Sequence, residues 1–120
     1  MENLCSENIL KMFEGYEKIV EALARRRFVV LTSKRLIVYV FKGVKRDYIV
    51  SPCRFCTCED FIINYLGKAR SVPCYHVIGF EIAERQDKLA KIELDYPTLS
   101  KVVEEIVFEG ISITLRKLLR

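Results

Sequence analysis

The chain has 120 residues, of which 51% are hydrophobic and 30% are charged, with only five glycines and three prolines. This composition is typical of one compact domain over residues 1–120, and a chain of this size is too small for a large multi-step enzyme. The longest apolar run, at residues 36–41, is far shorter than the ~20 residues that span a membrane, so we expect a soluble protein.

The first half of the chain predicts one helix followed by three strands. Apolar residues recur at helical spacing up to about Arg25, with Ser6 as a suitable N-cap. Three runs rich in β-branched and aromatic residues follow, at 28–32, 36–41 and 48–50, separated by short turns. We expect these runs to form a small antiparallel meander.

The second half predicts mainly helices. A short helix is expected at 60–66, a long one from about residue 75 to 92, and a last one from Pro97 to near Gly110. The tail, 111–120, fits a strand, a helix or an arm that binds a partner. The predicted fold class is therefore α+β, an antiparallel meander flanked by N- and C-terminal helices.

A cluster of metal-binding residue types lies in the middle of the chain. Cys56-x-Cys58 is followed by Cys74-x-His76, and His76 is the only histidine. Two short ligand pairs separated by a loop suit the closed tetrahedron of a structural zinc ion, because each pair supplies two adjacent vertices. We therefore predict one structural Zn²⁺ held by these four residues; the alternative is that the cysteines are buried as small apolar side chains.

The other two cysteines, Cys5 and Cys53, need a separate interpretation. We expect the cysteines of this chain to be reduced, as in intracellular proteins. Cys53 could join the three cysteines that follow it in an iron–sulfur cluster, but His76 would then have no role. We expect Cys53 to be a packed thiol and Cys5 to be a free one.

These residues carry a resemblance to a known family. Cys56-Thr-Cys58-Glu-Asp-Phe61, followed after a gap by Pro73-Cys74-Tyr-His76, resembles the SWIM zinc finger, whose pattern is CxC…CxH. The resemblance covers about residues 51–83 and implies a ββα-like unit that binds DNA or protein partners. The chain departs from the family at Glu59, where many members have Pro, and at Tyr75, where Lys is usual.

The rest of the architecture narrows the resemblance. A leading helix, a meander, a CxxCxC segment and a helix after CxH resemble the small SWIM subunit of the Shu complex and its archaeal relatives. The resemblance implies a non-catalytic accessory factor in homologous recombination and DNA repair that pairs with a RecA-type recombinase paralog. It would act in the cytoplasm, at the nucleoid, of an archaeon, or in the nucleus of a eukaryote.

Two alternatives to this function stay open. One is a stand-alone zinc-finger DNA-binding module of the transposase-associated or regulatory type, and the other is a purely structural adaptor. Enzymes are disfavoured, because the five glycines form no phosphate-binding G-x-x-x-x-G-K-[ST] loop. The zinc-deaminase pattern also requires H-x-E, and His76 is followed by Val77 and Ile78.

Charge is distributed unevenly, although the net charge is only +4. Residues 25–54 hold nine basic residues and one acidic residue, whereas residues 81–109 are mainly acidic. A basic segment favours single-stranded or branched DNA as a partner, the alternative being a solvated charged face. The candidate DNA contacts are Arg25, Arg26, Arg27, Lys34, Arg35, Lys42, Lys45 and Arg46.

The C-terminal segment holds more apolar residues than one face of a helix can bury. We expect some of them to pack against the recombinase paralog or a second copy of this chain, the alternative being the core of the domain. The candidate contacts are Val107, Phe108, Ile111, Ile113, Leu115 and Leu118.

Overall fold

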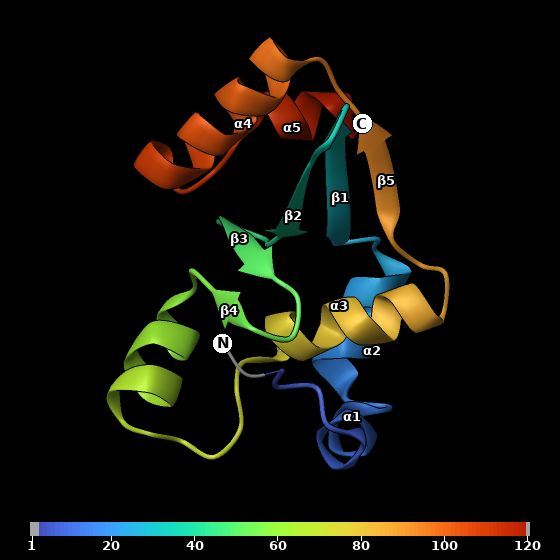
Figure 1. Ribbon diagram of the computed structural model, residues 1–120, viewed down its shortest axis with the longest axis vertical. Helices are drawn as coiled ribbons and strands as arrows, with labels where there is room; N and C mark the ends of the chain where they lie inside the picture. Colours follow the sequence, from blue (N-terminus) through green and yellow to red (C-terminus); the bar gives the residue numbers. More distant parts are fainter. Residues whose placement is uncertain (1–2, 120) are drawn as a thin grey trace.

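One mixed sheet organises the computed structural model, which describes residues 3–119. Four strands follow one another in antiparallel pairing, and a fifth joins the sheet beside β1 in parallel (Figure 1). The strands are β1 (Phe28–Ser33), β2 (Leu36–Lys42), β3 (Asp47–Ser51), β4 (Phe55–Cys56) and β5 (Ala90–Glu93), in the order β4-β3-β2-β1-β5. The α+β class is confirmed, and the predicted meander is β1 to β3.

The predicted N-terminal helix is two helices, α1 (Glu7–Phe13) and α2 (Glu17–Ala24). Ser6 caps α1 as expected, since its side chain accepts a hydrogen bond from the N–H of Ile9 at 3.2 Å. The break falls at Gly15, whose φ of 78° lies in the left-handed region that glycine adopts without steric cost. The apolar spacing continues across the break, which is why it predicted one helix.

The predicted long helix from residue 75 to 92 is wrong in its second half. Helix α3 (Tyr75–Arg85) ends early, and the chain turns through Asp87, at φ 55°, into β5. In β5 apolar and charged residues alternate from Ala90 to Glu93, a period of two that signals a strand. The sheet is therefore mixed rather than a purely antiparallel meander.

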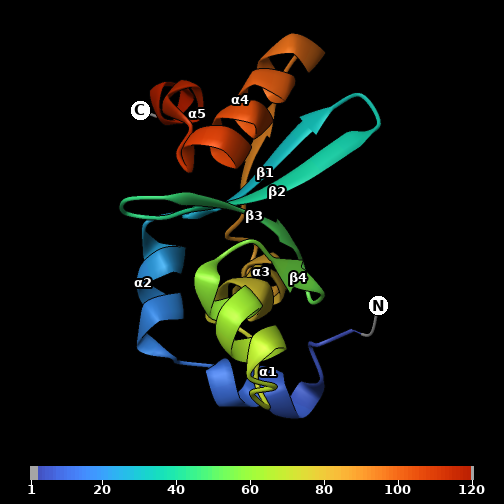
Figure 2. The ribbon, with the colours of Figure 1, turned by 90° about the vertical axis from the view of Figure 1, so that its left-hand side faces the viewer.

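The two faces of the sheet are covered by different helices (Figure 2). Helices α1, α2 and α3 cover one face, and α4 (Tyr96–Glu109) and α5 (Ile113–Leu118) cover the other. Neighbouring residues of β1 divide between the two cores, because side chains alternate along a strand: Phe28 packs with α3, and Val29 packs with α4. No helix within residues 3–119 is long and apolar enough to span a bilayer.

The C-terminal tail forms a helix that is tied to the sheet through a buried carboxylate. Asp47, 2% exposed, accepts hydrogen bonds from the Ser112 N–H at 2.8 Å and from the Arg116 guanidinium at 2.6 Å. Leu115, which we expected to contact a partner, is instead fully buried in the core beside α4. Ile111 is half-buried. The remaining candidates are exposed: Val107, Phe108, Ile113 and Leu118.

Candidate metal centre

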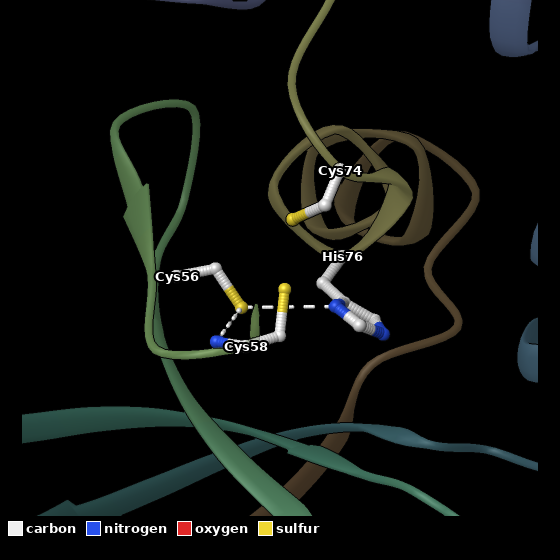
Figure 3. Close-up of side chains that lie close together, drawn as sticks. All are labelled: Cys56, Cys58, Cys74 and His76. Atoms are coloured by element: carbon white, nitrogen blue, oxygen red, sulfur yellow. Dashed lines mark hydrogen bonds between the residues drawn. The ribbon is translucent and has the colours of Figure 1, made fainter. Parts of the chain in front are cut away.

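The metal-ligand candidates come from two places in the fold. Cys56 ends β4 and Cys58 follows it, just before the π-helical segment η1 (Asp60–Gly67). Cys74 is the N-cap of α3, and His76 lies in the first turn of that helix. Figure 3 shows the two pairs facing each other across a narrow gap. The hairpin of β3 and β4 followed by α3 gives the ββα-like arrangement expected for residues 51–83.

The four ligand atoms lie close enough to hold one metal ion. All of them are within 4.8 Å of one another, and His76 Nδ1 is 3.7 Å from Cys56 Sγ. Ligands on a tetrahedral ion with bonds of about 2.3 Å stand about 3.8 Å apart, so a small contraction completes the site. All four residues are buried, with 7% exposure for His76 as the largest value. The donor set therefore fits a closed site in which the protein supplies every ligand.

Backbone amides stabilise negative charge on two of the sulfurs. The Cys58 N–H donates to Cys56 Sγ at 3.5 Å, and the Phe61 N–H donates to Cys58 Sγ at 3.4 Å. Such bonds from the surrounding backbone orient metal ligands and favour the thiolate form, which is the form that binds a metal.

The three thiol groups form hydrogen bonds with one another, and these bonds shift their pKa values. Hydrogen bonds from the Cys56 and Cys74 side chains lower the pKa of Cys58 far below its ordinary value. The pKa of Cys56 is raised, because its thiol donates to Cys58 and Cys74 and because it is buried. For Cys74, a hydrogen bond from Cys56 lowers the pKa, but its own bond to Cys58 and burial outweigh that effect and raise it to about 12. A divalent cation would supply the positive charge that three neighbouring thiolates need.

Aromatic rings hold the His76 side chain in place. Its ring centroid is 4.2 Å from that of Phe41, 4.3 Å from that of Tyr75 and 5.2 Å from that of Tyr48. Nδ1 faces the sulfurs, and the second ring nitrogen points away from them (Figure 3). The rings fix the orientation that Nδ1 coordination requires.

Cys5 and Cys53 form a disulfide bond, so the expectation of two separate thiols is wrong. Their Cα atoms are 5.1 Å apart, and the N–H of Leu4 donates to the carbonyl of Cys53 at 2.6 Å. The N-terminal segment is thus linked to the turn between β3 and β4, 48 residues later in the chain. The sequence does not predict this pair, because cysteines of intracellular proteins are expected to be reduced. The spacing of Cys5 and Cys53 also gives no sign that the two residues meet.

The structure separates the candidate DNA-binding residues into two groups. Lys34 and Arg35 form the turn between β1 and β2. Arg27 and Lys42 lie at the opposite end of this hairpin, where the Arg27 guanidinium donates to the Lys42 carbonyl at 3.0 Å. At about 3.3 Å per residue, the two ends are roughly 20 Å apart. The basic segment is therefore not one continuous surface.

A groove of about 710 Å³ lies beside the metal-ligand cluster and is lined in part by His76 and Cys58. Its basic residues are Lys18, Arg27, Lys45 and Arg46. Tyr48 and Tyr75 also line it, and burial raises the pKa of Tyr75 to about 12, so that its hydroxyl stays protonated. Lys18, Tyr48 and Tyr75 were not predicted as site residues, because Lys18 lies outside the basic segment and the tyrosines fit a strand and a helix without any further role.

Comparison with known proteins gives one distant relative. An uncharacterized protein of Archaeoglobus fulgidus is 40% identical over 58 residues, which cover 46% of this chain and 48% of that protein. The chain thus spans about half the length of the curated relative it matches. No protein-family model matches the sequence, and no solved structure matches it.

Proposed function

We propose that this chain is a non-catalytic, SWIM-type zinc protein that assists homologous recombination beside a RecA-type recombinase paralog, at the chromosome. The observation that carries the proposal is the buried set of Cys56, Cys58, Cys74 and His76, whose ligand atoms lie within 4.8 Å of one another. A site with four protein ligands leaves no open coordination position for substrate, which is typical of structural rather than catalytic zinc. The archaeal relative is compatible with this assignment.

The recombination role is supported by two surfaces of the molecule. One face of the sheet carries the groove with its four basic side chains, which favours contact with a polyanion. The other face carries α4, where Phe108 is 82% exposed and Val107 60% exposed. Large apolar side chains in such positions usually mark a protein-binding surface. The second surface favours a subunit that pairs with a partner over the alternative, a stand-alone DNA-binding module.

Metal analysis tests the zinc assignment. We expect one zinc per chain in the purified protein, and loss of that zinc in His76→Ala together with loss of much of the folded structure. The reason is that a structural zinc contributes on the order of 10 kcal/mol to folding. Ser6→Ala, which removes only a helix cap, is the matched folding control. Protein without zinc, or with the visible absorption of an iron–sulfur cluster, would contradict the proposal.

Affinity purification tests the recombination role. Tagged full-length chain, expressed in its native host, should co-purify with a RecA-type recombinase paralog identified by mass spectrometry. Val107→Asp should lose this partner, whereas Val20→Asp, at a valine of α2 that is 51% exposed, should keep it. A chain that captures no recombinase and binds duplex DNA unaided would support the alternative function instead.

A further inference from the structure

We propose that the groove beside the metal centre binds single-stranded DNA, with one or two nucleotides seated against its tyrosine rings and basic side chains. The inference deepens the proposed function and rests on it, because it assumes that this chain contacts DNA. It assigns the contact to Lys18, Arg27, Lys45, Arg46 and Tyr75. Five residues of the predicted set do not line the groove: Arg25, Arg26, Lys34, Arg35 and Lys42.

The basic residues of the groove come from three parts of the chain. Lys18 lies on α2, Arg27 precedes β1, and Lys45 and Arg46 form the turn between β2 and β3. Within residues 3–119, none of these four side chains forms an ion pair with a carboxylate. Arg27 is held in place by its hydrogen bond to the Lys42 carbonyl. The fold thus gathers unpaired cations that the sequence keeps apart.

Acidic residues of the groove do not cancel this charge. Glu21 pairs with Arg25 at 3.5 Å. Asp60 pairs with Arg70 at 2.7 Å. Glu59 is the remaining carboxylate, and three thiolates with Zn²⁺ would add one further negative charge. The four cations outweigh these two charges, so the groove attracts phosphate.

Two tyrosines on the walls of the groove supply aromatic rings. Tyr75 is half-buried, and Lys18 Nζ lies 5.8 Å from the centre of its ring. Tyr48 is also partly exposed along the groove. Aromatic rings interleaved with cations are the arrangement with which proteins stack the bases of single strands while holding the backbone.

His76 adds one further polar group to the wall of the groove. With Nδ1 directed at the sulfurs, a metal ion there leaves the proton on Nε2, which points away from the cluster (Figure 3). Metal-bound histidines normally donate this second N–H to an acceptor. His76 is 7% exposed and lines the groove, and among the described residues Nε2 is not a fully buried nitrogen that lacks a partner. A phosphate or base oxygen in the groove can accept a hydrogen bond from this N–H.

The dimensions of the groove favour a single strand over a duplex. At about 710 Å³, it has the size of a pocket for small ligands and accommodates one or two nucleotides. Stacking on Tyr75 or Tyr48 also requires an exposed base face, and in a duplex neighbouring bases cover these faces. We therefore expect the groove to bind single-stranded DNA in preference to a duplex.

The test uses the full-length, zinc-loaded chain and a fluorescein-labelled oligonucleotide of fifteen thymidines, about the site size of one small domain. Fluorescence anisotropy compares Lys18→Gln/Lys45→Gln with Lys34→Gln/Arg35→Gln, because each double variant removes two exposed positive charges. We expect the groove variant to bind at least about tenfold more weakly, with a log–log salt slope shallower by about 1.4, at ~0.7 for each phosphate that the variant leaves unneutralised. The control variant should keep the wild-type slope.

A second probe isolates the base contact. An abasic strand of the same length keeps the phosphates, so the wild-type chain should bind it roughly five- to 150-fold more weakly than the thymidine strand, the range for one stacked base. Tyr75→Leu should abolish this discrimination, and Tyr75→Phe should retain it. Zinc content, measured on every variant, identifies any weakening that comes from unfolding.

The results separate failure of the groove from failure of the proposed function. Equal loss of affinity in both double variants would overturn the proposal that the groove binds DNA, while leaving DNA contact elsewhere intact. Equal affinity of the wild-type chain for thymidine and abasic strands would do the same. A chain that captures its recombinase but binds no single strand would also overturn it. Tighter binding of a duplex than of the thymidine strand would do the same.

Discussion

Removing the Cys5–Cys53 disulfide is the perturbation whose cost follows most directly from the structure. We consider the double variant Cys5→Ser/Cys53→Ser, which keeps both positions small and leaves no unpaired thiol. The bond joins residues 48 positions apart. In the chain-entropy treatment of cross-links, closing a loop of that length raises the free energy of the unfolded state by about 4 kcal/mol at 25 °C.

This magnitude is large for a small domain. Domains are typically stable by about 5–15 kcal/mol, so the double variant should lose a considerable fraction of its free energy of unfolding. With a urea m-value of about 2 kcal/mol/M, the unfolding midpoint should fall by about 2 M. The native fold should persist, because the core on both faces of the sheet is unchanged.

Urea unfolding followed by circular dichroism measures this shift. Oxidised wild-type protein, wild-type protein with a phosphine reductant, and the double variant are compared, each with its zinc content determined. The reduced wild type should match the double variant, which separates the bond from the substituted side chains. An unchanged midpoint, or mass spectrometry that finds Cys5 and Cys53 as free thiols in the oxidised protein, would refute the reasoning.

Three further predictions concern the core and its charges. Asp47→Ala should cost about 3–5 kcal/mol in urea unfolding, because it leaves the partly buried Arg116 guanidinium without its carboxylate partner, with only the Gly43 carbonyl as acceptor; a cost below about 1 kcal/mol, the range of an exposed pair, would show that this ion pair does not hold the tail to the sheet. Gly79→Ala should cost about 1–3 kcal/mol, because the new Cβ would lie 2.3 Å from the Phe28 ring; a thermal midpoint equal to wild type would show that the ring moves freely. Burial raises the pKa of Glu105, but hydrogen bonds from Ser112 and Thr114 outweigh the effect of burial and lower this pKa below 4.5. The stability that the Glu105 carboxylate contributes to folding is therefore fully present above pH 4.5 and is lost as the pH falls through its folded-state pKa. The difference in free energy of unfolding between wild type and Glu105→Gln, measured by urea unfolding, should therefore close in acid.

The sequence predicts well those features that depend on neighbouring residues. The strands at 28–33 and 36–42 follow from β-branched runs and a short turn between them. The juxtaposition of the Cys56–Cys58 pair with Cys74 and His76 follows from ligand spacing alone, because few arrangements other than a metal site require it.

The features that sequence reasoning missed depend on long-range contacts. The break at Gly15 leaves the apolar spacing intact, so periodicity could not reveal it. Strand β5 is only four residues long, and the helix predicted from residue 75 to 92 extends over most of it. The Cys5–Cys53 bond joins segments that only the folded chain brings together. The groove likewise combines Lys18 with residues that lie far from it in sequence.

The parallel pairing of β5 with β1 has a consequence for the order of folding. Val29 pairs with Ala90, so closing this edge of the sheet brings together residues 61 positions apart, with the four metal-ligand candidates between them. The antiparallel pairs β1–β2 and β2–β3 join residues close in sequence and meet early, because short loops cost little entropy to close. Helix α3 begins at the metal ligands and leads the chain toward β5. We expect the β1–β5 pairing to form late, and a metal ion held at the start of α3 would favour it by fixing where that helix begins.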